Sequence, residues 1–354
     1  MDRSSKRAIA GILVVTLLTL AELILDRVNK IVPPPLSKII ERPVYRATFM
    51  AFGDINLGRM IGQRILKGDI DFPFQKINLS EDSADIIFAN LESQLSDQNG
   101  ETVNKKSNIV FTGPPEGAQS LRNAGITVVS TANNHALDYG NSALRETIDL
   151  LRSENIFHVG TSKSLKNLYQ PLIIEKNNIK FAIFAVTSFV NFNPKRWMET
   201  VAATDTVRLK EEIDKVRESV DIIVLSYHGG VEYTLRPVEP TRRFADWCIK
   251  NGVDLFIGHH PHVSFGVQKR SDKFIVHSLG NFVFFQPQHY WTQRSYGIKF
   301  WFEKQDSSVA FGIEKFIPLK VGLQTERLID TTEIKKLRYR TQQLSNFDLS
   351  TYWN

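Results

Sequence analysis

Polar side chains with the chemistry of a metal site follow several short apolar runs of this sequence. The runs are rich in β-branched and aromatic residues, and the positions just after them hold carboxylates, amides and imidazoles. This mix without thiolate suits Mn²⁺, Zn²⁺ or iron, with Mg²⁺ a poorer match. The residues concerned are Asp54, Asn56, Asn90, Glu92, Asn134, His135, His228, His259, His260 and His262. Together they predict a site for divalent metal ions, built from separate parts of the chain.

The runs that precede these residues have the length and composition of buried strands, and polar segments between them have helical patterns. Strands are expected at 47–52, 84–89, 126–131, 180–186, 221–227 and 253–258, and helices at 114–125, 141–155, 207–219 and 239–252. Such alternation is typical of an α/β fold. Since ligands bind at the carboxyl ends of strands in open α/β sheets, the polar clusters should converge there. Apolar runs within 263–321 lack intervening helices and suggest a second, more antiparallel sheet.

Each cluster also has a structural explanation of its own. Asp54 could cap the start of a helix, Glu92 could lie in a first helical turn, and a single histidine such as His228 is more often a hydrogen-bonded structural residue. The sequence HHPH at 259–262 is harder to explain structurally, because crowded imidazoles need a ligand. The joint pattern therefore favours a functional site over separate structural roles.

Composition limits the alternatives. The chain has 354 residues, of which 42% are hydrophobic, enough for a large core. Its formal net charge is +6, but residues 1–46 hold +4 of it, so a general nucleic-acid-binding surface is not expected. The single cysteine, Cys248, excludes an intrachain disulfide and a thiolate metal cluster and is expected to be buried in a helix.

The N-terminal segment has the pattern of a membrane anchor. Residues 8–25 are an apolar run in which Glu22 is the charged residue, and basic residues precede it. The run is short for a membrane span and long for a signal peptide, but no A-x-A-like cleavage site follows it. We expect an uncleaved single-pass anchor at 1–26 with the folded domain on the extracytoplasmic side; a cleaved signal peptide is the alternative. A Pro-containing linker (27–45), the main domain (46–320) and a helical tail (321–354) should follow.

The ordered motifs GDINLGR, NLES, ANNHALDYG, HGGVEY, GHHPHV and HSLGNFVF resemble those of the CapA family, the capsule-synthesis proteins associated with poly-γ-glutamate. That family is similar to calcineurin-like metallophosphoesterases, which carry a dinuclear metal site on a two-sheet α/β sandwich. The resemblance implies this fold and two divalent metals for this chain. It also implies an anionic polymer or its precursor as ligand, and other capsule-synthesis membrane proteins as partners.

The resemblance further implies a role for each site residue. The implied metal ligands are Asp54 and His262 for the first metal, Glu92 as the bridge, and Asn134, His228 and His260 for the second. His260 and His262 are chosen because alternate residues of an extended HHPH segment point the same way, and His259 should then pack inward. His135 would face the substrate and protonate a leaving oxygen, and Asp138 can orient its ring. Two departures stand out: Asn56 replaces the usual histidine, and Glu92 replaces an aspartate. The weaker amide ligand predicts loose or substrate-dependent binding of the first metal.

Other residues are candidates for contact with substrate. Arg59 could meet an anionic group, although a surface arginine is equally expected there. Glu232 should brace His228 or meet substrate, and we favour the brace. Asn281 and Ser278 lie in HSLGN, where a Gly-Asn pair is also a common turn signal.

Three functions remain open from the sequence. The first is a membrane-anchored metal-dependent hydrolase or transferase acting on a capsule-type polymer or its phosphorylated precursor. The second is a non-catalytic component that binds and hands on the polymer during export. The third is a metal-dependent phosphoesterase unrelated to capsule. The presence of His135, Asp54, Glu92 and His228 favours the first.

Overall fold

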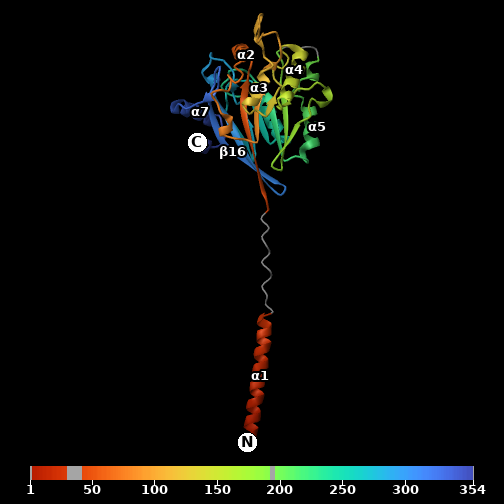
Figure 1. Cartoon of the computed structure of the whole chain (residues 1–354), viewed down its shortest axis with the longest axis vertical. Coiled ribbons are helices and arrows are strands. Elements are labelled where there is room, and N and C mark those ends of the chain that lie inside the picture. Colours follow the sequence, from red (N-terminus) through yellow and green to blue (C-terminus); the bar gives the residue numbers. More distant parts are fainter. Residues whose placement is uncertain (1, 30–41, 192–195, 354) are drawn as a thin grey trace. The chain divides into compact units, whose positions relative to one another are not determined.

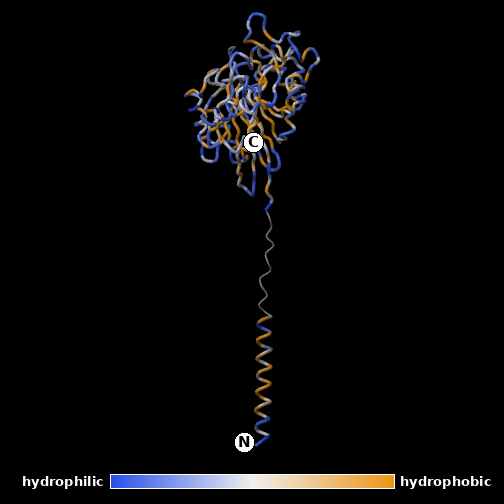
Figure 2. Tube along the Cα trace, turned by 90° about the vertical axis from the view of Figure 1, so that its left-hand side faces the viewer, coloured by the Kyte–Doolittle hydropathy of each residue, from blue (hydrophilic) through white to orange (hydrophobic). Residues whose placement is uncertain are grey.

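The computed structural model describes residues 2–29, 42–191 and 196–353, which divide into the compact units Met1–Pro43 and Val44–Asn354. The first unit contains helix α1 (Arg3–Asn29). By length and composition, α1 can cross a membrane, and signal sequences can have the same length and composition. At 1.5 Å per residue it is about 40 Å long, against about 30 Å for a bilayer's hydrocarbon core. Figure 2 shows apolar residues along most of it. Residues 30–41 of the predicted linker lie outside the described residues.

The second unit is built on a larger and a smaller sheet (Figure 1). The order of the larger sheet is β17 (Glu326–Arg327), β16 (Ser308–Lys320), β15 (Arg294–Gln305), β1 (Val44–Ile55), β2 (Ile86–Leu91), β6 (Val128–Ser130) and β7 (Phe157–Val159). β14 (Asn281–Val283) also pairs with β1. The order of the smaller sheet is β12 (Val267–Arg270), β13 (Lys273–Val276), β11 (Leu255–His259), β10 (Ile222–His228), β9 (Ile179–Thr187) and β8 (Leu172–Lys176).

Helices pack against both sheets. Those that follow the first unit are α2 (Arg59–Leu66), α3 (Gly117–Asn123), α4 (Gly140–Ser153), α5 (Thr206–Arg217), α6 (Glu239–Lys250) and α7 (Thr331–Gln343). Short 3₁₀ turns are η1 (Leu79–Glu81), η2 (Leu165–Asn167), η3 (Trp197–Glu199), η4 (Tyr290–Gln293) and η5 (Ser350–Tyr352). A small sheet of β3 (Gln94–Leu95), β5 (Ser107–Gly113) and β4 (Val103–Asn104) lies near α2 and α4. The predicted α/β fold with two sheets is confirmed.

The core lies in layers because successive side chains of a strand point to opposite faces. Phe49 of β1 and Phe181 of β9 belong to one core cluster between the sheets, and their ring centroids are 6.4 Å apart. Their neighbours Met50 and Phe184 point to the opposite faces and pack in the outer clusters. Cys248 of α6 is fully buried in one of these, as predicted. The double burial explains why the central strands read as continuous apolar runs.

The prediction that the strands within residues 263–321 form a sheet of their own was wrong. Residues 263–321 do not form a second sheet of their own, because they add to both sheets. β15 and β16 extend the larger sheet from the side of β1, whereas β12 and β13 complete the smaller one next to β11. The antiparallel hairpins were recognisable, but their partners depend on pairing between distant residues.

The tail packs into the domain more firmly than a surface helix would. It contains α7, as predicted, and Leu337 of that helix is fully buried. Beyond α7, Leu349 is also fully buried, and the ring of Trp353 stacks on Phe316 of β16 at 4.5 Å. Residues 321–353 thus contribute to the core, and the predicted boundary at 320 divides one compact unit.

Candidate metal centre

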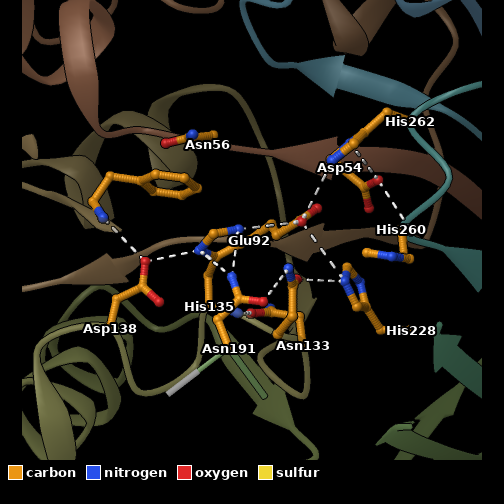
Figure 3. Close-up of polar contacts among 12 residues, drawn as sticks. Asp54, Asn56, Glu92, Asn133, His135, Asp138, Asn191, His228, His260 and His262 are labelled. Carbon is orange, nitrogen blue, oxygen red and sulfur yellow. Dashed lines mark hydrogen bonds and ion pairs between the residues drawn. The ribbon is translucent and has the colours of Figure 1, made fainter. Parts of the chain in front are cut away.

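Strand ends from both sheets meet at the candidate centre (Figure 3). Asp54 lies one residue before the end of β1, in register with Asn90 of β2. Glu92 follows the last residue of β2. In the smaller sheet, His228 ends β10 and His259 ends the adjacent β11. The predicted convergence at the carboxyl ends of the parallel strands is therefore present, and it includes both sheets.

Glu92 lies in the middle of this group. Its Oε1 is 3.6 Å from His228 Nε2, 3.8 Å from His262 Nε2 and 4.0 Å from His135 Nε2. Two sets of side chains have ligand atoms close enough to hold a metal ion, and both contain Glu92. The sets are Glu92, His228 and His260, and Asp54, Glu92 and His262. A bridging carboxylate between two cations would have this arrangement.

The state of Glu92 fits a cation. The residue is fully buried, and neither of its carboxylate oxygens has a hydrogen-bond partner among the described residues. Burial, followed by the charge of Asp54, raises its pKa well above the ordinary value. The imidazoles of His228 and His260 do not supply a compensating charge, because burial, followed by the charge of neighbouring histidines, lowers the pKa of both well below the usual range. An uncompensated buried carboxylate is costly, and divalent metal ions would relieve that cost.

Asp54 is held from several sides. His259 Nδ1 is 3.2 Å from its Oδ1, and His262 Nδ1 is 3.4 Å from its Oδ2. The side chain of Asn90 donates to Oδ1 at 2.9 Å, and the backbone N–H of His260 donates to Oδ2 at 3.3 Å. Burial acts to raise the pKa of Asp54, but the hydrogen bonds from His259 and His262 outweigh it and hold the pKa well below the ordinary value. Asp54 is thus fixed as an anion beside Glu92.

The HHPH segment is not extended. His260 has a φ of 94° and His262 a φ of 58°, in a region that bulky side chains rarely adopt. Such strain is typical of functional sites. The bent backbone brings His260 and His262 to the centre, as alternation had suggested, while His259, the last residue of β11, lies against Asp54. His259 was expected only to pack inward; it is fully buried, and it is also part of the centre.

His135 and Asp138 form a hydrogen-bonded pair at the edge of the centre. His135 Nδ1 lies 2.7 Å from Asp138 Oδ2, which also accepts the backbone N–H of Phe111 at 3.0 Å. The Phe111 ring stacks on the imidazole with centroids 4.0 Å apart. With Nδ1 engaged by a carboxylate, Nε2 is the nitrogen on the side of Glu92. The geometry that had been expected for an oriented imidazole is present.

Asparagine side chains link the His135–Asp138 pair to the other histidines of the centre. Asn134 Oδ1 is 2.7 Å from His228 Nε2, so the predicted amide ligand lies beside the predicted imidazole ligand. The sequence analysis gave no role to Asn133, whose Nδ2 donates to the Leu91 carbonyl at 2.7 Å and whose Oδ1 accepts the His135 backbone N–H. The double asparagine in ANNH was a visible signal for this residue. Phe111 and Asn191, which contacts both nitrogens of His135 at 3.4 Å, had no comparable signal.

The side chain of Asn56 takes part in a backbone turn. Its side-chain oxygen accepts the backbone N–H of Gly58 at 2.7 Å, and in Figure 3 no drawn contact links it to the other residues. Asparagine commonly bonds to the backbone two residues further on in this way. The oxygen that was predicted to bind the first metal also stabilises the turn between β1 and α2.

Glu232 and Asn281, two of the candidates for contact with substrate, do not have the neighbours that were expected. The exposed Glu232 does not brace His228, because the imidazole nitrogens of His228 face Asn90 and Asn134. Asn281 is fully buried: its Oδ1 faces His262 Nδ1 at 2.9 Å and its Nδ2 donates to Gln286 and to the Thr292 carbonyl. It therefore positions His262 and has no atom available to substrate. Ser278 is likewise buried and bonds to Gly280.

Arg59 remains next to the centre. Its guanidinium lies 4.6 Å from the centroid of the Phe111 ring, on which His135 also packs, and its Nη2 donates to the Asn108 carbonyl at 2.7 Å. Burial lowers its pKa, and the charges of Tyr233, Glu92 and Asp138 act in the opposite direction. Its backbone has a φ of 52°, which is unusual for arginine. Arg59 is thus a fixed cation beside the acidic centre.

The fold and this centre define a two-sheet α/β protein with a buried carboxylate–histidine cluster. A family model described as bacterial capsule synthesis protein PGA_cap matches residues 48–286, more than half of the chain. The chain therefore belongs to this family of bacterial capsule synthesis proteins. The predicted family resemblance is confirmed.

Relatives and solved structures are also similar to the chain. The capsule biosynthesis protein CapA of Bacillus anthracis is 26% identical over 87% of this chain and 75% of its own length. The PGA biosynthesis protein CapA of Bacillus subtilis is 29% identical over 71% of this chain and 66% of its own length. Similar solved structures include the sulfate thiohydrolase SoxB of Thermus thermophilus (15% identity, TM-score 0.42, covering 75% of this chain and 41% of that chain). Another is a 5'-nucleotidase of Candida albicans (12% identity, TM-score 0.42, covering 86% of this chain and 55% of that chain).

Proposed function

We propose that this protein is a membrane-anchored, metal-dependent hydrolase or transferase of capsule biosynthesis, acting on an anionic polymer or its phosphorylated precursor. The observation that carries the proposal is Glu92: a fully buried carboxylate without a hydrogen-bond partner, shared by two metal-binding sets and 4.0 Å from an imidazole that does not belong to either set. A structural core has no need of such a group.

The residues present fit a pair of divalent cations. Glu92, His228 and His260 would hold one, and Asp54, Glu92 and His262 the other. When bound, the metal ions would supply Lewis-acid polarisation of a phosphoryl or acyl oxygen. Asn134 could contribute a neutral oxygen beside His228.

His135 would handle the proton. The Asp138 carboxylate holds its Nδ1 side and would stabilise the protonated ring, so Nε2 can donate a proton to the leaving oxygen of the substrate. Phe111 fixes the ring plane by stacking and keeps water from one of its faces. Arg59, which also lies against the Phe111 ring, would pair with an anionic group of the substrate.

The proposed location at the membrane is supported by α1. The described side chains of this helix are exposed along its length, and the apolar residues among them need a non-aqueous environment. Membership of a family of capsule synthesis proteins is consistent with a function at the cell surface. We infer that α1 anchors the protein and that the catalytic unit faces the extracytoplasmic side.

A matched pair of histidine variants tests the catalytic proposal. His135→Ala should leave metal content and thermal stability nearly unchanged and reduce turnover of a small phosphodiester by about 10²–10⁴-fold. His158→Ala removes an imidazole from β7, which contributes no residue to the metal-binding sets. It should leave metal content and turnover unchanged. Full activity in His135→Ala protein that still contains metal would contradict the catalytic role and favour a non-catalytic polymer-binding protein.

A further inference from the structure

A chain of hydrogen bonds connects His262 with the hydroxyl of Tyr233. Asn281 Oδ1 lies 2.9 Å from His262 Nδ1, and Asn281 Nδ2 donates to Gln286 Oε1 at 3.0 Å. Gln286 Nε2 in turn donates to the hydroxyl oxygen of Tyr233 at 3.1 Å. Asn281 and Gln286 are both buried. The chain thus joins a predicted metal ligand to a tyrosine that has no role in the function proposed above.

The direction of each bond in this chain is fixed. Asn281 Nδ2 also lies 3.1 Å from the Thr292 carbonyl, which can only accept, so the Asn281 amide has one orientation. Its Oδ1 must then accept from His262 Nδ1–H, which leaves Nε2 of the neutral ring without a proton, as a metal ligand requires. Because Gln286 Oε1 accepts from Asn281, Gln286 Nε2 donates to Tyr233. The Tyr233 oxygen thus receives a hydrogen bond, and its own proton is left for another acceptor.

The backbone also holds Tyr233 at the edge of the centre. Its φ is 59°, in a region that bulky side chains rarely adopt. Its N–H donates to the carbonyl of Pro261 at 3.0 Å, and Pro261 lies between His260 and His262 in the chain. The ring centroid of Tyr233 is 6.0 Å from that of His262. Such a strained conformation persists where the surrounding structure fixes it, which is typical of functional sites.

Arg59 lies near Tyr233. Both residues line a groove of about 1320 Å³, and Arg59 packs on Phe111. Arg59 Nε is buried and has no hydrogen-bond partner among the described residues. Burial, followed by the charges of Glu232 and Glu92, raises the pKa of Tyr233, whereas the charge of Arg59 acts to lower it. The Tyr233 hydroxyl therefore keeps its proton at neutral pH and lies within electrostatic range of both Arg59 and Glu92.

A reacting group at the centre would meet donors in several directions. The metal-binding sets, His135 and the neighbouring Tyr233 and Arg59 are separate groups of the site. A phosphoryl group directs its oxygens to the corners of a tetrahedron and spreads its negative charge over them, so it can meet all of these donors at once. A carboxylate or an amide offers its oxygens in a single plane, and oxygens engaged by metal ions would leave none for Tyr233.

We propose that the Tyr233 hydroxyl donates a hydrogen bond to an anionic oxygen of a phosphoryl group held at the centre, and that it thereby favours phosphoryl over carboxylate ligands. The inference rests on the proposed function and deepens it, because it selects a phosphoryl group over an acyl group as the one that reacts. The exposed carboxylate of Glu232, to which the hydroxyl also bonds, would compete for the same proton.

The test compares two tyrosine variants of the full chain, kept in detergent and loaded with Mn²⁺. Tyr233→Phe removes the hydroxyl and keeps the ring, and Tyr339→Phe makes the same change at an exposed position of α7. The probes are inorganic phosphate and acetate, and their binding is measured by titration calorimetry. Tyr233→Phe should bind phosphate at least about tenfold more weakly than the wild type, and acetate equally well. Tyr339→Phe should match the wild type with both probes, and both variants should keep its metal content and Tm.

Other outcomes separate this inference from the proposed function. Equal phosphate binding by the wild type and Tyr233→Phe would overturn the role of Tyr233, even if the wild type cleaves esters. Equal weakening of phosphate and acetate would overturn the choice of a phosphoryl group. Glu232→Gln should bind phosphate at least as tightly as the wild type, and weaker binding would contradict a competing role for Glu232. If Tyr233→Phe alone loses phosphate but the wild type cleaves no ester, the contact stands and the hydrolase proposal fails.

Discussion

Replacing Glu92 by glutamine is expected to stabilise the metal-free protein while removing its capacity to hold metal. Glutamine keeps the shape of the side chain and removes a charge that is fully buried and unpartnered. A buried group left without a hydrogen-bond partner costs about 1–3 kcal/mol, and more when charged. We therefore expect the free energy of unfolding of the metal-free protein to rise by about 2 kcal/mol at mildly alkaline pH. For a domain of this size, that corresponds to an increase in Tm of about 4 °C.

The expected gain has a definite pH dependence. Because burial and Asp54 raise the pKa of Glu92 in the folded state, the folded protein retains a proton that the unfolded chain releases. The wild type should therefore lose stability as the pH rises from the ordinary glutamate value toward the raised value. At a pH below both the ordinary and the raised pKa of Glu92, the glutamic acid and the glutamine are each neutral. The wild type and the variant should then be equally stable. Asp54, whose pKa is lowered well below the ordinary value, titrates below this pH range and therefore stays ionised throughout the comparison.

The assay is thermal unfolding of chelator-treated full-length protein across this pH range, together with the metal content of untreated protein. Glu175→Gln, at an exposed position of β8, removes a carboxylate without affecting the centre and serves as the control. Adding a divalent metal ion should reverse the order of stability, because the wild-type carboxylate then has a cation partner. A metal-free Glu92→Gln protein that is less stable than the wild type at mildly alkaline pH would refute the reasoning.

Four further outcomes are expected. His228→Ala should lower metal content and activity together, which elemental analysis and an ester assay would show. Asn56→Ala should retain far more metal than a Glu92 variant, because its oxygen is bonded to the turn; equal losses would contradict this. Asp138→Asn should keep its metal but turn over substrate about 10–100-fold more slowly, since His135 loses its orienting carboxylate. Cell fractionation should place the full chain in the membrane, and a cytosolic pool would argue against an anchor at 8–25.

The parts of the fold that depend on local pattern could be predicted from the sequence. The buried strands were visible as continuous apolar runs, and the helices between them as amphipathic segments. Convergence of the polar clusters within each sheet could be predicted from their positions at strand ends, because parallel strands present their carboxyl ends at one edge. The proximity of Glu92 to His228 also requires the larger and the smaller sheet to face each other, which the family resemblance implied and the strand pattern did not.

What the sequence could not supply depends on backbone bends and on pairing between distant segments. His259 and the adjacent His260 both lie at the centre, and the segment after β11 has positive φ angles at His260 and His262, which an extended conformation of HHPH excludes. Asn281 braces His262 because β14 pairs with β1, and no local pattern specifies that pairing. The hydrogen bond from the Gly58 N–H to the Asn56 side chain could have been predicted, since an asparagine two residues before a glycine often forms a turn.

The position of β1 has a consequence for how the domain folds. Val44 of β1 lies opposite Gln305 of β15, so the central strand of the larger sheet finds this neighbour only after most of the domain exists. Pairings between residues so distant in sequence slow folding, because a long loop must close before any contact compensates for its lost entropy. Until then β1 has an exposed apolar edge, which other chains can join. Fragments that end before Arg294 should accordingly aggregate, and slow synthesis at low temperature should favour a soluble product.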